Sequence, residues 1–535
     1  MTIRRPGALG PLVLCLWLLA GAGVDVLAAE LRLSRAEYED RVHAVWAGQV
    51  IGMLLAYPFE HRVGSVAWVD DFREPTTWEP LVADCARVDD DWYYEIVALR
   101  ALERYGIDVT VEELGRQWIA DSAGSWGSSA ETRRLLLAGL KPPDTGHPRF
   151  NPLWYTIGPQ FSADIYGAIA PGMPNVAGQF ARKLGHIHGY AEGADGAVFV
   201  AGMVSIAFAE SDCRRVVRKA AALVHPSSPY RQCLDAIVGM GEAGASFQQV
   251  ARAVADRWQL EYPATNNAVA NGGFIAAGLW FGEGDFLKTV NLIARADDFT
   301  DADCNAANAG AVLGAMHGTE CLPPELLRQL GDRIRGDKMG PIAFSPPVDE
   351  RISELARRTA AVGERIVTAN GGRVSDKGIV VTLEEPAAQP PELFRLADLM
   401  QYWNPAWELH GAGFGYRGGV RGATRLDGDV LATYPRDEVR GVSLRRRVTL
   451  GDRAVLLFEA GADGGRAWRL NVWVDNERVD ERLIEAGDKR TEWQQVRIDL
   501  APFARRQVHI RIYQLVLTGA SRSPGSAYWR NLTLE

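Results

Sequence analysis

The spacing of apolar positions divides the chain into two regions. Between residues 34 and about 367, apolar residues recur every three or four positions, which is the spacing of one helix face. Few segments before residue 375 alternate with a period of two. We therefore expect an all-α domain here, with a Pro-rich tract around Pro341, Pro346 and Pro347 and a last helix at 352–366 as its tail. The main helical segments are 36–55, 92–105, 111–122, 175–184, 196–208 and 304–316.

After Gly371 the pattern changes to alternation of apolar and polar residues in short segments. The predicted strands are separated by turns such as Asp427-Gly428 and Asp475-Asn476, and they are found at 454–458, 468–474, 494–500 and 508–515. This is typical of a β-sandwich. The closing SAYWRNLTLE resembles the last strand of galactose-binding-like jelly rolls. We place the boundary near residue 390, in the Pro-rich stretch 386–391.

Length and charge narrow the classes of protein. The chain has 535 residues, 47% of them apolar, which is enough for more than one domain. A net charge of −9 argues against a protein that follows nucleic-acid phosphates, because such proteins need a basic field. We therefore expect a multidomain protein with no nucleic-acid partner, whose oligomeric state the residues do not indicate.

The N-terminus has the pattern of a secretory signal. Arg4 and Arg5 precede an apolar stretch at 12–20, and small residues at 26–29 form a cleavage site. The apolar stretch is shorter than the roughly 20 residues of a membrane span, so we expect no stable anchor. The predicted organisation is a signal peptide at 1–29, a helical domain at 30–390 and a β-sandwich at 391–535, in an exported, periplasmic or secreted protein.

The densest run of acidic residues is Asp89-Asp90-Asp91, directly before the predicted helix 92–105. Carboxylates at a helix N-terminus are stabilised by the macrodipole, so capping with solvated charge is one interpretation. Three in a row exceed what a cap requires, and packed like charges repel unless a cation neutralises them. Hard divalent ions prefer such oxygen ligands. Both interpretations stay open from these residues alone.

A second acidic run, Asp301-Ala302-Asp303, opens another predicted helix. Gly310, Gly314 and Gly318 follow at helical spacing and let this helix approach its neighbours closely. Close approach matters because ligands from two helices must converge on ions about 3.5–4 Å apart in a two-metal site. A capped helix with a small-residue packing face is equally compatible with the pattern.

Together the two runs resemble the ADP-ribosylglycohydrolase family, an all-α family with a Thr-Asp-Asp-Thr type motif early and an Asp-x-Asp-Thr or Asp-x-Asp-Ser motif late. Asp90 and Asp91 fall on the early motif, with Asp89 at its Thr-like position. The most specific match is DADCNAANAGAVLGAMHG, which begins at Asp301. GMLLAYPFE is similar to the family's N-terminal motif, and IGPQFSADIYGAIAPGMPNVA and HIHGYAEGADGAVFVAGM to the middle segment of a bacterial branch. The resemblance spans roughly residues 35 to 365.

The resemblance implies a centre of two Mg²⁺ or Mn²⁺ ions and assigns its residues. The implied metal ligands are Asp89, Asp90, Asp91, Asp301, Asp303 and Cys304. Catalytic roles are implied for Asp90 and Asp303, and for Glu60 as a mobile carboxylate near the leaving group or metal. An exposed loop position after Pro58 is the alternative for Glu60.

Four residues depart from the family pattern: Met53 replaces an Asp, Ala56 a Gly, Trp92 a Thr, and Cys304 a Thr or Ser. A thiol is a poor ligand for Mg²⁺, although a softer ion accepts one, and a small buried residue is the other interpretation of Cys304. Six polar residues in Gly-punctuated stretches are candidates for substrate binding, and each is equally compatible with a turn or cap. They are Asp164, Tyr166, Asn175, His188, Asp195 and Asn267.

The predicted activity is that of an exported, metal-dependent glycoside hydrolase that cleaves an N- or O-glycosidic bond of ADP-ribose or a related glycoside. Its substrate is then a small molecule or a glycan. The alternative, suggested by Met53, Trp92 and Cys304, is a catalytically inactive glycan-binding protein that reuses the fold. Tryptophans of the β region either stack on sugars or pack in the core: Trp403, Trp407, Trp468, Trp473, Trp493 and Trp529.

Overall fold

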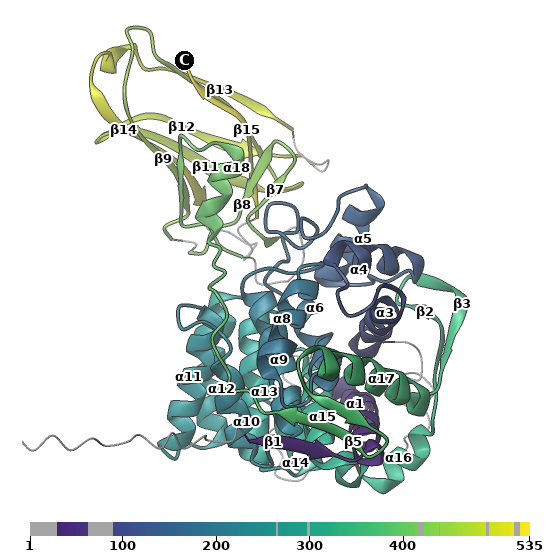
Figure 1. The fold of residues 1–535 in the computed structure, drawn as a ribbon. Coiled ribbons are helices and arrows are strands. Elements are labelled where there is room, and N and C mark those ends of the chain that lie inside the picture. The colour runs from purple at the N-terminus through teal and green to yellow at the C-terminus, as the bar shows by residue number, and fades with distance from the viewer. Residues whose placement is uncertain are drawn as a thin grey trace, which may run out of the picture.

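The computed structural model describes residues 29–61, 89–263, 266–296, 300–414, 422–437, 439–487, 492–517 and 525–535. Residues 1–28, which hold nearly all of the predicted signal peptide, lie outside this set. The described chain forms a helical domain and, beyond it, a domain of antiparallel sheets (Figure 1). The predicted succession of a helical domain and a β-sandwich is confirmed.

The helical domain is built around helices that are buried on nearly every side. α1, α9, α13 and α15 carry buried residues along most of their lengths. The helices are α1 (Arg35–Ala56), α3 (Asp90–Tyr105), α4 (Val111–Ala120), α5 (Gly127–Leu137), α6 (Gly158–Phe161), α7 (Asp164–Ala168), α8 (Pro174–Gly185), α9 (Glu192–Ala207), α10 (Cys213–Ala221), α11 (Pro229–Glu242), α12 (Phe247–Val254), α13 (Ala268–Gly282), α14 (Phe286–Ala294), α15 (Ala302–His317), α16 (Pro324–Leu330) and α17 (Ile352–Ala369).

Two small sheets lie within the region expected to be all-α. β1 (Glu30–Leu33) pairs with β5 (Gly378–Thr382), which also pairs with β4 (Arg373–Ser375). β2 (Ile334–Met339) and β3 (Ile342–Glu350) form a hairpin where a Pro-rich tail was expected. The register shifts between Gly336 and Lys338, and Pro346 and Pro347 stand opposite this irregularity. Prolines, which have no N–H to donate, are tolerated at such a break in the ladder.

Helices α1 and α15 approach each other through glycines. A Cβ on Gly310 would lie 2.2 Å from the carbonyl oxygen of Gly48, and one on Gly52 would lie 2.3 Å from that of Ala306. Gly314 meets the backbone of Ala44 in the same way, at 2.3 Å. The close approach expected from the small residues of 310–318 is therefore present, and it brings the start of α15 beside the end of α1.

The first core helix is also the most apolar one. By length and composition, residues Arg35–Phe59 are the one described helical segment able to cross a membrane. In the structure 78% of its apolar window is buried inside the protein. Burial against α15 and α17 therefore accounts for its composition, as in the core helix of a globular domain.

The second domain packs two five-stranded antiparallel sheets face to face. One sheet has the order β13-β10-β15-β8-β7 and the other β12-β11-β14-β9-β6. The predicted turns are confirmed at Asp427-Gly428 and Asp475-Asn476, where Gly428 and Asp475 have positive φ of 61° and 53°. The strands are β6 (Glu408–His410), β7 (Arg425–Asp427), β8 (Val430–Thr433), β9 (Val442–Thr449), β10 (Val455–Ala462), β11 (Ala467–Val474), β12 (Glu477–Glu485), β13 (Gln494–Asp499), β14 (Gln507–Val516) and β15 (Ala527–Leu534).

The tryptophans of this domain divide between its core and its surface. Trp407, Trp468 and Trp529 are buried in the core between the sheets, and Trp468 and Trp529 contact each other at 5.0 Å between ring centroids. Core packing therefore accounts for these three. Trp473 and Trp493 are only half-buried.

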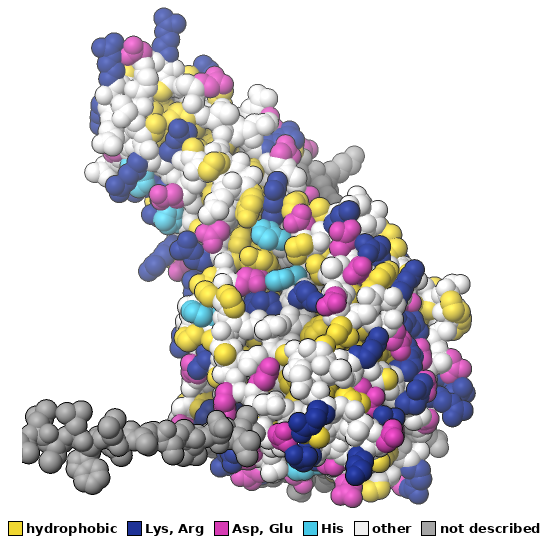
Figure 2. Space-filling view, viewed as in Figure 1, with side chains coloured by type: hydrophobic (Ala, Val, Ile, Leu, Met, Phe, Trp, Pro, Cys, Tyr) yellow, Lys and Arg dark blue, Asp and Glu magenta, His cyan; other side chains and the backbone are white. Residues whose placement is uncertain are grey.

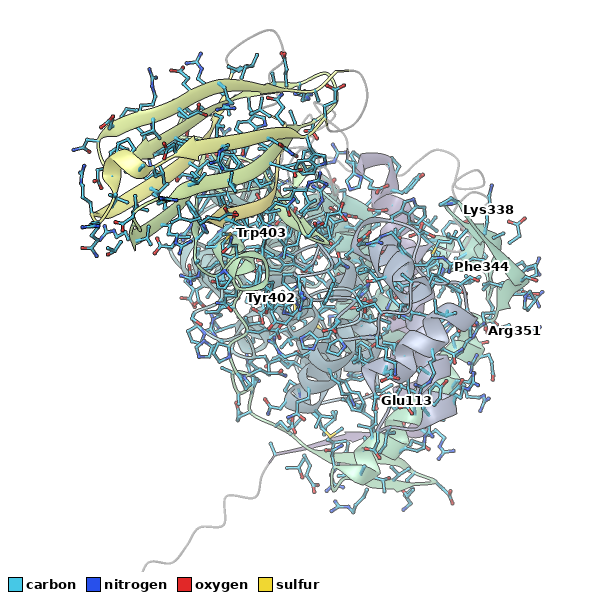
Figure 3. The ribbon with its side chains drawn as sticks, turned by 90° about the horizontal axis from the view of Figure 1, so that it is seen from above. Glu113, Lys338, Phe344, Arg351, Tyr402 and Trp403 are labelled. Carbon is cyan, nitrogen blue, oxygen red and sulfur yellow. The ribbon has the colours of Figure 1, made fainter. Side chains whose placement is uncertain are left out.

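The two domains meet through an aromatic junction. Tyr402 and Trp403 belong to the short helix α18 (Met400–Trp403), which lies beneath the sandwich in Figure 3, far from the hairpin residues Lys338 and Phe344. Phe414 of the β domain packs on Tyr155 of the helical domain, with ring centroids 4.1 Å apart. The second domain is thus anchored to the first rather than attached only by the connecting segment.

The glycine contact between α1 and α15 generates a stability prediction. Gly310→Ala forces a methyl group against the Gly48 backbone, which cannot rotate away, so the free energy of unfolding should fall by about 1–3 kcal/mol or more. The matched control is Gly239→Ala in α11, where an added Cβ meets nothing within 4 Å. There the loss of glycine flexibility should stabilise the helix by about 0.5–1 kcal/mol. Denaturant unfolding of both variants measures the difference, and equal effects would contradict the close approach.

Candidate active site

A cavity of about 370 Å³ lies where the end of α1, the start of α3 and the start of α15 meet. Its lining combines carboxylates with hydroxyl, amide and aromatic groups, and it consists of Tyr57, Glu60, His61, Asp89, Asp90, Trp126, Gly127, Ser128, Ser129, Thr156, Ile157, Gly158, Phe161, Asn266, Asp301, Asp303 and Cys304. The two acidic runs, far apart in sequence, therefore converge on one cavity.

Local structure explains how each carboxylate reaches the cavity. Asp89 is the N-cap of α3, with extended backbone, and its side chain accepts a hydrogen bond from the Asp91 N–H at 3.4 Å. Asp301 is the N-cap residue of α15 but makes no capping bond with its side chain. Both acidic runs thus sit at helix N-termini, whose positive dipole ends favour negative charge.

Asp91 differs from its neighbours because it lies behind the cavity. It is 1% exposed, and neither of its carboxylate oxygens has a hydrogen-bond partner among the described residues. One oxygen each of Asp301 and Asp303 is also buried without a hydrogen-bond partner there. A buried, unpartnered carboxylate oxygen is costly unless a cation or proton compensates it.

This donor set fits a hard divalent cation. Ligand atoms of Asp301, Asp303 and Cys304 all lie within 4.8 Å of one another, and so do those of Glu60, His61 and Asp301. Carboxylate oxygens are the groups that Mg²⁺ and Mn²⁺ prefer. Burial, reinforced by the neighbouring Asp301 and Asp91, raises the pKa of Cys304, which favours a protonated thiol over a thiolate ligand.

Crowding of the carboxyl groups shifts their pKa values. Burial raises the pKa of Asp90, Asp91 and Asp303, and the charges of neighbouring carboxylates add to the effect. Burial and the charge of Asp301 also raise the pKa of Glu60 to about 7. Without a cation, the group therefore holds protons that isolated carboxyls would lose.

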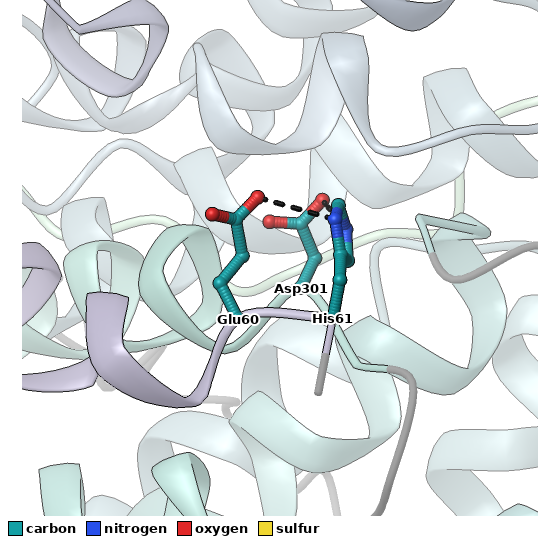
Figure 4. Close-up of side chains that lie close together, drawn as sticks. All are labelled: Glu60, His61 and Asp301. Carbon is teal, nitrogen blue, oxygen red and sulfur yellow. Dashed lines mark ion pairs between the residues drawn. The ribbon is translucent and has the colours of Figure 1, made fainter. Parts of the chain in front are cut away.

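His61 was not found from the sequence, yet it joins the two sides of the site. Its Nδ1 lies 3.3 Å from Glu60 Oε1, and its Nε2 lies 3.5 Å from Asp301 Oδ2 (Figure 4). Burial alone would lower the pKa of His61, but the hydrogen bond and charge of Asp301 raise it to about 9. The same contacts hold the pKa of Asp301 below its ordinary value despite burial.

The position of His61 depends on backbone that no residue spacing reveals. Its φ is 51°, an unusual value for a residue other than glycine, and its N–H donates to the Thr300 carbonyl oxygen at 3.0 Å. The only sequence signal was its place directly after Glu60. Without a second histidine or cysteine at ligand spacing, that signal was too weak to single it out.

The wall of the cavity comes from two short extended segments. Thr156 and Asn267 form an isolated β-bridge, the Ile157 N–H donates to the Asn266 carbonyl oxygen at 2.9 Å, and the Ala268 N–H donates to that of Tyr155 at 3.0 Å. Residues 126–129 complete it. Apart from Asn267, these wall residues were also missed, although the Gly- and Ser-rich stretch GSWGSS at 124–129 was a visible sign of a loop.

Four of the six predicted substrate-binding residues are buried, and three of them, Asp164, His188 and Asn267, lie close behind this lining. Asp164 accepts a hydrogen bond from Asn308 at 2.8 Å, and its pKa is raised by burial and by the charges of Glu95 and Asp91. The His188 Nδ1 lies 2.9 Å from the hydroxyl of the lining residue Ser129, and burial lowers the His188 pKa to about 3. The other two are Tyr166, which is buried in α7, and Asn267, the N-cap of α13.

The remaining two predicted residues serve other contacts. Asn175 binds the segment that leads to the β domain, through the Glu384 carboxylate and the Glu385 carbonyl oxygen. Asp195 pairs with Arg182 at 2.5 Å and accepts a hydrogen bond from Ser228. Neither residue lines the cavity. The sequence pattern did not distinguish them, because polar residues near glycines also occur at helix starts and domain junctions.

Three of the departures from the family pattern are core residues. Met53, Ala56 and Trp92 are 0% exposed and belong to the hydrophobic core of the helical domain. They therefore contribute no side chain to the cavity lining. Of the departures, only Cys304 faces the cavity.

Comparisons with known proteins give the chain a family. A search of curated proteins gives no match. Among solved structures, a chain described as an ADP-ribosylglycohydrolase-related protein complex is 16% identical, covers 61% of this chain and 99% of its own, and has a TM-score of 0.40. A structure described as CBM4 structure and function is 12% identical, with coverages of 25% and 88% and a TM-score of 0.18.

A Stig cyclase, Fisc, from Fischerella sp. TAU is 14% identical, with coverages of 24% and 73% and a TM-score of 0.16. These TM-scores are too low to carry an argument. The family profile of ADP-ribosylglycohydrolase, in contrast, matches residues 34–366, which is more than half of the 535 residues and includes every carboxylate of the cavity. The protein therefore belongs to the ADP-ribosylglycohydrolase family.

Proposed function

We propose that the protein is an exported, divalent-metal-dependent glycoside hydrolase that cleaves an N- or O-glycosidic bond of ADP-ribose or a related glycoside. One observation carries the proposal. Carboxylates from three separate segments line a single cavity, and buried oxygens of Asp301 and Asp303, and of Asp91 behind them, have no hydrogen-bond partner among the described residues. A pair of cations would compensate the charge of these carboxylates, whereas helix capping leaves their buried oxygens without a partner.

The residues divide into a metal-holding group and a proton-holding group. Asp89, Asp90, Asp91, Asp301 and Asp303 are the proposed ligands of two Mg²⁺ or Mn²⁺ ions. When bound, such ions supply Lewis-acid polarisation and a water of lowered pKa. Negative side chains left around the substrate also stabilise the positive charge that develops at the anomeric carbon during glycoside cleavage.

Glu60 is the proposed proton-holding residue. Its pKa of about 7 allows the carboxyl group to hold or release a proton near neutral pH, as an acid-base residue needs. His61 holds Glu60 Oε1 from one side and Asp301 from the other. This contact fixes the orientation of Glu60 relative to the metal-holding group.

The proposed substrate class is supported by the volume of the cavity and by the family of the chain. A volume of about 370 Å³ is within the range of small-molecule sites and accommodates a sugar with part of its aglycone. Export is supported by the charged, apolar and small-residue pattern of residues 1–29. A glycoside encountered outside the cytoplasm is therefore the substrate we favour.

Cation binding should depend on the acidic runs. Asp303→Asn removes a charged ligand and should weaken Mg²⁺ or Mn²⁺ binding about tenfold or more. The matched control is Asp235→Asn, because Asp235 is exposed in α11 and pairs with Arg231 at 2.7 Å. Titration calorimetry of the purified mature protein measures both. If both variants bind as the unmodified protein does, the metal site is wrong.

The metal-free protein should lose stability as the pH rises. Carboxyls with raised pKa bind protons in the folded state that the unfolded chain has already released, so unfolding becomes easier between about pH 4 and 7, the latter being the raised pKa of Glu60. A bound cation replaces those protons. We expect Mg²⁺ or Mn²⁺ to raise the melting temperature more at pH 8 than at pH 5, by at least about 2 °C.

Differential scanning calorimetry with and without chelator, at both pH values, tests this expectation. Asp303→Asn should reduce the cation-dependent increase, and Asp235→Asn should leave it unchanged. An increase that is equal at pH 5 and pH 8 would contradict the crowded-carboxylate site.

Hydrolysis should require both the cation and Glu60. A panel of ADP-ribosylated peptides, nucleoside-like glycosides and wall-derived glycosides, assayed with and without Mg²⁺ or Mn²⁺, identifies the substrate class. On the best substrate, Glu60→Gln should lower the rate about 10²- to 10⁴-fold. Glu242→Gln, at an exposed ion pair with Arg218, should leave it unchanged. Saturable ligand binding with no turnover by any member would instead favour the inactive glycan-binding alternative.

A further inference from the structure

One face of the β domain carries aromatic, polar and cationic side chains that do not pack in its core. In β11, Leu470, Val472 and Val474 are buried in the core between the sheets, and in β14 Ile510 and Ile512 are. Successive side chains of a strand point to opposite faces, so the residues between these point outward. The outward set on β11 and β14 is Arg469, Asn471, Trp473, His509, Arg511 and Tyr513.

Strand register places these residues side by side. Trp473 stands opposite Arg511, and Arg511 stands opposite Arg445 on β9. In the neighbouring rows, Asn471 stands opposite Tyr513, and His509 stands opposite Arg447. The outward face, defined here by Asn471, Trp473, Arg511, Tyr513, Arg445 and Arg447, therefore brings two aromatic and three cationic side chains together over three adjacent strands.

The positive charge of the outward face is only partly balanced within the described chain, where Glu408 of β6 stands opposite Arg445 and Glu481 of β12 stands opposite Asn471. Arg445 donates to the Ser443 hydroxyl at 2.9 Å and Arg511 to the Asp475 backbone carbonyl, but neither of them, nor Arg447, pairs there with a carboxylate. Like charges directly opposite each other on neighbouring strands are destabilising. A protein of net charge −9 thus maintains three adjacent unpaired guanidinium groups.

Two polar atoms beneath this face have no hydrogen-bond partner among the described residues. Asn471 is 8% exposed, and its side-chain oxygen is buried with no hydrogen-bond partner among the described residues. The Arg511 Nε is in the same state. Buried polar atoms without a partner are rare in folded proteins, and two of them here belong to facing strands of one surface.

The aromatic residues of this face are positioned for a flat ring. Trp473 is half-buried, with the Arg511 guanidinium carbon 5.9 Å from its ring centroid, and Tyr513 is half-buried on the adjacent strand. Aromatic rings that keep one face partly exposed stack on the apolar face of a sugar ring. A guanidinium group binds a carboxylate through two parallel hydrogen bonds.

We infer that the outward face of the β domain is a binding site for a uronate-bearing polysaccharide, with sugar rings on Trp473 and Tyr513 and carboxylates on Arg445, Arg447 and Arg511. In Figure 2, Lys and Arg side chains (dark blue) with His (cyan) appear along the left edge of the upper, β domain. A uronate-bearing polysaccharide matches both features of this face, because its carboxylates pair with guanidinium groups and its sugar rings stack on partly exposed aromatic rings. This site is separate from the cavity and does not depend on the proposed hydrolysis.

Affinity electrophoresis of the full chain in gels containing polygalacturonate tests the inference. Retardation is expected with polygalacturonate and not with a neutral glucan of similar length, double-stranded DNA or chondroitin sulfate depleted of uronate carboxylates. Arg447→Gln and Arg445→Gln should each raise the dissociation constant about fivefold or more, and Tyr513→Ala should do the same through lost stacking. The matched control is Arg505→Gln, because Arg505 is 81% exposed and bound to Asp452 at 2.6 Å, and it should change binding less than twofold.

Thermal melting of each variant separates lost binding from lost folding, and Arg447 is exposed with no hydrogen bond or ion pair in the described chain, so its substitution leaves the fold intact. No retardation by polygalacturonate would overturn the inference. So would equal retardation by double-stranded DNA, by the neutral glucan or by the chondroitin sulfate depleted of uronate carboxylates, or binding that Arg447→Gln and Arg445→Gln leave unchanged.

Discussion

The structure is organised around the repulsion between carboxylates that share one buried cavity. Two acidic runs and Glu60 approach closely enough that burial and neighbouring charge raise the pKa of most of them. The fold tolerates this crowding by placing the runs at the N-termini of α3 and α15 and by setting His61 between Glu60 and Asp301. These devices offset only part of the charge, because oxygens of Asp91, Asp301 and Asp303 stay unpartnered, and a divalent cation is the natural completion.

The distance between the acidic runs is controlled by backbone contact rather than by the acids themselves. Gly48 and Gly52 on α1 meet Gly310 and Ala306 on α15 with no side chain between them. This contact brings Glu60, just beyond α1, to the start of α15. A larger residue at this contact between α1 and α15 would move one helix against the other and change the separation of the carboxylates. The packing of the core therefore determines the geometry of the cavity.

The β domain contacts the helical domain next to the wall of the cavity. Phe414 packs on Tyr155, whose carbonyl oxygen accepts from Ala268 in the wall that carries Thr156 and Asn266. Arg436 also pairs with Glu261 of the helical domain at 3.2 Å. The sandwich thus supports the back of the cavity wall, while its outward sheet face, on β9, β11 and β14, remains available for a different ligand. One domain can hold both roles because Phe414 and Arg436, which contact the helical domain, lie outside the strands β9, β11 and β14.

The sequence by itself determined the helical and sandwich regions, the turns at Asp427-Gly428 and Asp475-Asn476, and the two acidic runs, because periodicity, turn chemistry and clustered charge are local properties. It also indicated the close approach of α15 through Gly310 and Gly314. Only the tertiary structure decided that His61, Trp126, Ser129 and Asn266 share the cavity, that Asp91 lies behind it, and that Asn175 and Asp195 bind elsewhere. Those outcomes depend on which segments meet in space, and the side-chain pattern of any one segment does not contain that information.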